Sequence, residues 1–165
     1  MQAMKLQSGS PKESAKDPLQ LSLYRQLCKT TFGRQDSGFS HLFLTTQWNL
    51  MCRSKSAQTV CTEHLISHDD SIGCTIYRSK TNKEGYGPKD PRHMYAIALK
   101  PETCWVTALA VYLACRPTQP PRPLFPGSEQ KTRFGSILLK LVAELKHQTH
   151  YGHTFNPKRS CHICL

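Results

Sequence analysis

The sequence predicts a mixed α+β protein that is mainly helical and contains one small β-hairpin. Three observations support this fold class. Apolar residues recur at helical spacing in the first and last thirds of the chain. In the middle of the chain, one short run alternates between two sets of side chains, as a β-strand does, and a second run has the composition of an extended segment. Polar, glycine-rich and proline-rich turns separate these segments. We therefore expect a helical body that carries a small sheet.

The first part of the chain predicts two helices. Leucines at helical spacing indicate a short helix over 18–29, and a glycine-containing loop follows over 33–38. A long helix is predicted over 39–60, with a break around 53–56 that would divide it. Its apolar face is expected to contain Leu44, Trp48, Met51 and Cys52.

The middle of the chain predicts the hairpin. Asp69 and Asp70, the one pair of adjacent carboxylates, lie in a polar sequence that indicates a solvated turn. Alternation over 72–77 predicts a strand, a polar turn is expected over 79–88, and a second strand over 93–99 pairs back on the first.

The last third predicts two more helices. Pro101 and Glu102 suit the first turn of a helix whose body, 105–115, is apolar nearly all round. That body is too short to span a bilayer, so we expect a buried core helix. A proline-rich linker follows over 116–123, and an apolar stripe predicts an amphipathic helix over 128–146.

Composition limits the function. The chain has 165 residues, a net charge of +11 and only 38% hydrophobic residues, so collagen, coiled coil and a transmembrane bundle are excluded. Nucleic acid is the first candidate partner and an anionic membrane surface the second. No phosphate-binding loop, dinucleotide-binding glycine motif or nucleophile elbow occurs. We expect phosphate contacts from a set of cations: Arg53, Lys80, Lys83, Lys89, Arg92, Lys131, Arg133 and Lys140.

The ends of the sequence differ from its centre. Residues 1–18 are basic and poor in apolar side chains, so we expect disorder there, followed by a folded domain over 19–146. No secretory signal is apparent, which predicts an intracellular protein with reduced thiols. Six cysteines are expected to be small buried apolar residues: Cys28, Cys52, Cys61, Cys74, Cys104 and Cys115. The tail 147–165 has metal-like spacing, and its candidate zinc ligands are His150, His153, Cys161 and Cys164.

Several ordered motifs together carry a family resemblance. They are Gln47-Trp48-Asn49-Leu50-Met51-Cys52-Arg53-Ser54, Ser79-Lys80-Thr81-Asn82-Lys83-Glu84-Gly85, Arg92-His93-Met94-Tyr95, Pro101-Glu102-Thr103-Cys104, Leu124-Phe125-Pro126-Gly127-Ser128 and Arg133-Phe134-Gly135. Over residues 19–155 the chain resembles the catalytic domain of the phage-integrase-like tyrosine recombinases of Crypton-type mobile DNA elements. These enzymes cut DNA by attack of a tyrosine on a phosphodiester, so cationic donors must balance charge on the phosphate oxygens.

The resemblance implies a role in the site for each of several residues. Arg53 matches the arginine that follows a Trp-containing segment. Lys80 matches the hairpin lysine that acts as general acid, with Lys83 in reserve, and His153 matches the histidine of a His-x-x-Arg motif. Asn156 occupies the position of that motif's arginine, and Pro157 disfavours a continuing helix.

These departures shape the predicted function. No tyrosine occupies the nucleophile's position, since Tyr112 falls on the buried helix and Tyr151 precedes the motif. We therefore expect a C-terminally truncated, incomplete recombinase-like domain that binds DNA without cutting it, needs no cofactor, forms homo-oligomers on DNA and is located in the nucleus. The alternatives are an active recombinase completed in trans by a partner subunit, a small zinc-binding interaction module, and a fragment without a stable fold.

Overall fold

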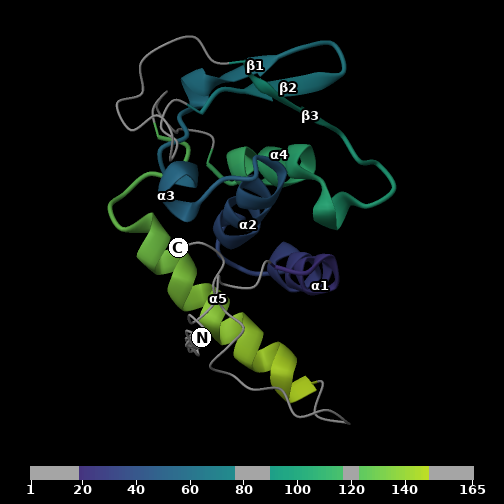
Figure 1. The fold of residues 1–165 in the computed structure, drawn as a ribbon, viewed down its shortest axis with the longest axis vertical. Helices are drawn as coiled ribbons and strands as arrows, with labels where there is room; N and C mark the ends of the chain where they lie inside the picture. The colour runs from purple at the N-terminus through teal and green to yellow at the C-terminus, as the bar shows by residue number, and fades with distance from the viewer. Residues whose placement is uncertain (1–18, 77–89, 117–122, 149–165) are drawn as a thin grey trace, which may run out of the picture.

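The computed structural model describes residues 19–76, 90–116 and 123–148 (Figure 1). It is a mixed α+β structure with a small three-stranded sheet, so the predicted fold class is confirmed at this level. Its elements are α1 (Leu21–Phe32), α2 (Phe39–Asn49), α3 (Ser54–Ala57), the 3₁₀ turn η1 (Thr62–His64), β1 (Leu65–Ser67), β2 (Ser71–Cys74), β3 (Arg92–Tyr95), the 3₁₀ turn η2 (Pro101–Thr103), α4 (Trp105–Ala114) and α5 (Gln130–Gln148).

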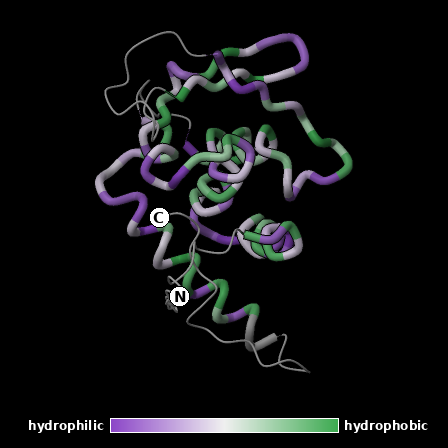
Figure 2. The backbone as a smooth tube through the Cα atoms, in the orientation of Figure 1, coloured by the Kyte–Doolittle hydropathy of each residue, from purple (hydrophilic) through white to green (hydrophobic). Residues whose placement is uncertain are grey.

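Helix α2 is the centre of the packing. It contacts α1, α3, α4 and α5, and every residue from 39 to 47 is buried. Figure 1 shows α2 and α4 between the sheet and the pair α1 and α5, and Figure 2 shows the apolar residues gathered on α2 and α4. The indole Nε1–H of Trp105 donates to Oγ1 of Thr46 at 2.9 Å, which ties α4 to α2.

The sheet is larger than the predicted hairpin. It is antiparallel with the order β1-β2-β3, and Cys74 pairs with Leu65 on one side and with Arg92 on the other. Strand β1 was not predicted, because three residues are too few to show alternation. The strands expected over 72–77 and 93–99 are shorter in the structure, at 71–74 and 92–95. Asp69 and Asp70 are exposed between β1 and β2, as expected of a solvated turn.

The helix predicted over 39–60 is divided into α2 and α3, but the division begins at Leu50 and not at the break expected around 53–56. Helix α2 ends at Asn49, and Met51 follows with φ 46°, in the left-handed region. The N–H of Cys52 donates to the carbonyl of Gln47 at 3.1 Å, and the N–H of Met51 donates to that of Trp48 at 3.2 Å. These two bonds form the Schellman motif that ends many helices. Glycine usually marks this position, so a methionine there gave no signal in the sequence.

Met51 supplies a test of this helix end. Its side chain is 82% exposed, so replacing it forfeits little burial, while glycine removes the strain of a left-handed L-residue. We expect Met51→Gly to raise the free energy of unfolding by about 0.5–1 kcal/mol. Urea unfolding measures the change, and Met51→Ala, which keeps the strain, serves as the control. A less stable glycine variant would contradict the assignment.

The last two helices are only partly as predicted. Helix α4 begins at Trp105, after η2, and it is not buried all round: Ala110, Val111, Leu113 and Ala114 are exposed. Its apolar composition therefore misled the prediction of a fully buried helix. Helix α5 begins at Gln130 and is amphipathic as expected, with four stripe residues buried: Phe134, Leu138, Leu141 and Val142. No helix in the described ranges has the length and apolar content needed to cross a membrane.

Candidate functional site

Arg53 stands at the junction of α2 and α3. The sequence predicts a break in the helix at this residue, and in the structure Arg53 is the N-cap of α3, with extended backbone angles of φ −76° and ψ 155°. Its carbonyl accepts from the N–H groups of Ser56 and Ala57, both at 2.8 Å, which begins the short helix. The side chain is exposed. The backbone of Arg53 is thus held by α3 while its guanidinium faces solvent.

Arg92 opens β3 and comes close to the same junction. Burial raises the pKa of the Cys52 thiol to about 12, Cys74 adds to the rise, and the guanidinium of Arg92 partly opposes it. Burial also raises the pKa of Cys74 to about 11, again opposed by Arg92. The exposed Arg92 side chain therefore lies near the thiol of Cys52, the residue that directly precedes Arg53.

Arg53 and Arg92 form what we call the arginine pair. They come from segments about forty residues apart in the chain, and the link between these segments is the effect of the Arg92 charge on the pKa of Cys52, the residue before Arg53. In the described part of the chain, neither has an acidic partner; the ion pair found there joins Arg34 and Asp36, with Nε to Oδ2 at 3.4 Å. Both guanidinium groups are thus exposed positive charges that no acidic side chain pairs with in the described ranges.

The other predicted DNA contacts that the structure describes lie on α5. The backbone N–H of Lys131 donates to Oε1 of Gln58 at 3.2 Å, which joins the start of α5 to the end of α3. The guanidinium of Arg133 lies over the Phe39 ring, 3.9 Å from its centroid. Lys140 is exposed further along the helix. No described contact joins Arg133 or Lys140 to the arginine pair.

Seven predicted site residues lie outside the described residues. They are Lys80, Lys83, Lys89, His150, His153, Cys161 and Cys164. The lysines belong to residues 77–89, which lie in the connection between β2 and β3. Cys74 and Arg92 pair at the end of the sheet from which this connection leaves, so the connection begins and ends beside Arg92.

Tyr112 is buried on α4, as the sequence predicted. The guanidinium of Arg116 lies over the Tyr112 ring, 4.6 Å from the ring centroid. Burial raises the pKa of its hydroxyl, and Arg116 and Arg133 partly oppose the rise. The hydroxyl has no hydrogen-bond partner among the described residues. A phenol so enclosed is not available to attack a phosphodiester.

The cysteine predictions are partly wrong. Cys28, Cys74 and Cys104 are buried, as expected, but Cys52 and Cys61 are only half-buried and Cys115 is exposed where α4 leaves the core. The six described thiols are free.

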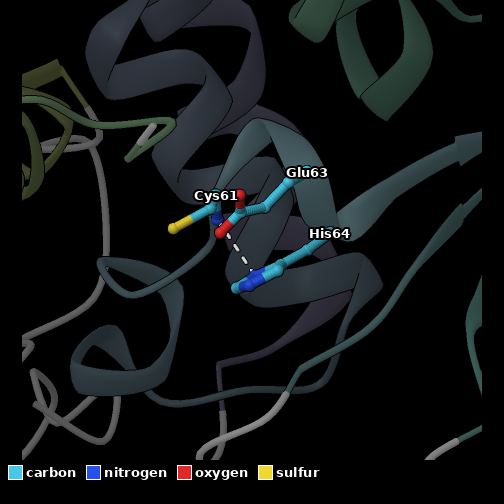
Figure 3. A group of neighbouring side chains, drawn as sticks. All are labelled: Cys61, Glu63 and His64. Carbon is cyan, nitrogen blue, oxygen red and sulfur yellow. Dashed lines mark hydrogen bonds between the residues drawn. The ribbon is translucent and has the colours of Figure 1, made fainter. Parts of the chain in front are cut away.

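The sequence reasoning missed one group of side chains. Cys61, Glu63 and His64 lie on and beside η1, and their sulfur, oxygen and nitrogen ligand atoms lie within 4.8 Å of one another (Figure 3). The Cys-x-Glu-His spacing was the available signal. It was overlooked because Cys61 was interpreted as an apolar residue.

Comparison with protein-family models, with curated proteins and with solved structures finds no match to this chain.

Proposed function

We propose that this protein binds double-stranded DNA through a cationic surface centred on Arg53 and Arg92. The observation that carries the proposal is the arginine pair: two exposed guanidinium groups without an acidic partner in the described ranges. Guanidinium groups present a planar fork of donors that matches phosphate oxygens, and they keep their charge at any physiological pH. Such a pair suits the phosphate backbone of DNA.

The resemblance to tyrosine recombinases supports the same surface. It assigns a phosphate-binding role to Arg53 and a general-acid role to Lys80 on the hairpin. The connection between β2 and β3 contains Lys80 and leaves the sheet beside Arg92. Lys83 and Lys89 lie in the same connection and would add contacts to the phosphate backbone. Assembly of several copies on DNA, and a nuclear location, belong to this proposal.

Strand cleavage is not part of the proposed function. The resemblance requires a second arginine at the position of Asn156 and a nucleophilic tyrosine, and Tyr112 is enclosed by protein. Loss of the nucleophile in a comparable triad enzyme lowers the rate by about 10⁶. DNA binding without chemistry is the function that these residues support best.

The salt dependence of DNA binding tests the proposal. Each phosphate contact contributes about 0.9 to the slope of log K against log salt concentration. We expect the double variant Arg53→Gln, Arg92→Gln to reduce that slope by about 1.8 and to weaken binding at least ~10-fold near 0.15 M salt. Fluorescence anisotropy of a labelled duplex with the full chain measures both quantities.

A matched control removes two charges elsewhere. Arg25 and Lys29 are exposed on α1, which packs against α2, η2 and α5 rather than the sheet. Arg25→Gln with Lys29→Gln should change binding much less. Equal losses in both double variants would mean that net charge alone attracts DNA, and would overturn the assigned surface. A protein–DNA adduct that survives detergent would show that the chain does cut DNA.

A further inference from the structure

The group Cys61, Glu63 and His64 offers three different ligand atoms on one short segment. In the described ranges it is the one group of three or more potential ligands that lies close enough to hold a metal ion. Thiolate, carboxylate and imidazole are all ligands of Zn²⁺, and three protein ligands with a water in the fourth position form a common tetrahedral site. None of the three residues belongs to the proposed DNA-binding surface, although Leu65, which follows His64, pairs with Cys74 as Arg92 does. The metal-binding inference does not rest on the proposed function.

The 3₁₀ turn explains why the three side chains meet. The N–H of His64 donates to the carbonyl of Cys61 at 3.0 Å, and the N–H of Cys61 donates to Nδ1 of His64 at 3.1 Å (Figure 3). The second bond turns the imidazole back toward Cys61. In this bond Nδ1 is the acceptor, so it carries the lone pair that a metal ligand needs. Figure 3 shows the carboxylate of Glu63 folded toward Cys61 as well.

The turn is anchored to a distant part of the chain. The N–H of Leu124 donates to the carbonyl of Val60 at 2.8 Å, and Cys61 forms an isolated antiparallel bridge with Pro123. On its other side η1 continues directly into β1. An ion at this turn would therefore lie where the sheet, α3 and the segment before α5 come together.

We propose that Cys61, Glu63 and His64 bind one divalent ion of the zinc type, through Sγ, a carboxylate oxygen and Nδ1, with water as the fourth ligand. Binding releases the thiol proton of Cys61 to solvent, and the thiolate and carboxylate then balance the two charges of the ion. The ion takes the Nδ1 lone pair in place of the Cys61 N–H, so one hydrogen bond is exchanged for a coordination bond. Ligand atoms at about 2.0–2.3 Å from a tetrahedral zinc ion lie closer together than the 4.8 Å within which these three atoms now lie. The exposed Glu63 side chain can rotate inward to shorten these distances.

Cobalt substitution tests the site. Co²⁺ bound to a thiolate gives a sulfur-to-metal charge-transfer band, and tetrahedral geometry gives intense visible bands. With the full chain and Co²⁺ or Zn²⁺ as the only added ligand, we expect one ion per chain. Cys61→Ser should abolish the charge-transfer band, and Glu63→Gln should weaken Co²⁺ binding at least tenfold. Because Glu63 is exposed, the second variant keeps the test valid even if the first fails to fold.

Other thiols provide the controls. Cys115→Ser removes the exposed thiol, and Cys161→Ser with Cys164→Ser removes the thiols of the C-terminal sequence. Both variants should keep the band at full strength. A band that survives Cys61→Ser, or one that disappears with Cys161 and Cys164, would overturn the proposal and assign the metal to other ligands.

Discussion

Replacing Phe43 by alanine is expected to lower the free energy of unfolding by about 3–5 kcal/mol. Phe43 is fully buried on α2, and its ring centroid lies 5.6 Å from that of Phe39, 4.9 Å from Phe125 and 4.7 Å from Phe134. These contacts join three separate parts of the chain: the central helix, the segment before α5, and α5 itself. The loss combines burial with the cavity left behind, because the neighbouring rings can relax only partly.

That loss is large relative to the stability of most domains. Native proteins are stable by only about 5–15 kcal/mol, so the alanine variant should be partly unfolded under mild conditions. Urea unfolding followed by circular dichroism measures the change in midpoint at constant slope. Phe43→Leu is the control, since it keeps most of the volume and should cost less than about 1.5 kcal/mol. A loss below about 1 kcal/mol for alanine would mean that α2 and α5 do not share one core.

The stability of the protein should fall between pH 6.5 and pH 4 because of His41. Burial lowers the pKa of this imidazole from 6.5 to about 4, although Asp36 and Glu102 partly oppose the shift. The unfolded chain therefore takes up the proton at a higher pH than the folded chain does. The contribution of His41 to the free energy of unfolding is fully present above pH 6.5 and falls by about 1.4 kcal/mol per pH unit below it. At pH 4 the free energy of unfolding is lower by about 3 kcal/mol.

The hydrogen bonds of His41 explain why its neutral form is favoured. The hydroxyl of Thr31 donates to the carbonyl of Leu27 at 2.8 Å, so its oxygen accepts from Nδ1–H of His41 at 2.9 Å. Nε2 then carries the lone pair and has no hydrogen-bond partner among the described residues. Protonation would place a second N–H, and a charge, in an enclosed site without an acceptor.

His41→Asn isolates this effect. The asparagine amide can still donate to Thr31 but does not titrate, so most of the fall in stability between pH 6.5 and pH 4 should disappear. Burial lowers the pKa of His64 in the same direction, which accounts for a smaller remaining slope. His68→Gln, at an exposed position, should keep the full fall. Urea midpoints across this pH range measure the three slopes, and an unchanged slope in His41→Asn would contradict the assignment.

The helices were predictable to the extent that their signals are local. The stripe from Phe134 to Leu145 and the apolar body that begins at Trp105 each indicate a helix, and both helices form. Where the local signal is absent, the prediction failed. Met51 ends α2 without the usual glycine, and β1 is too short to show a period. The exposed face of α4 was mispredicted because composition does not say which side of a helix meets a neighbour.

The candidate sites, like the helices, were predictable only where their signal is local in the sequence. The sequence identified Arg53 and Arg92 as cations available for phosphate, and the proximity of Cys61 to His64 follows from a single turn of chain. It could not bring Arg92 to Cys52, because that approach depends on the register of β2 with β3 and on where the sheet packs.

By itself, then, the sequence determined the fold class, three of the helices and the positive character of the chain, because periodicity and charge are properties of neighbouring residues. Only the tertiary structure decided which thiols the charge of Arg92 acts on, which cysteines are buried and which face of α4 is exposed. Those outcomes depend on contacts between residues far apart in the chain, and the hydrophobic burial that drives such contacts has no direction of its own.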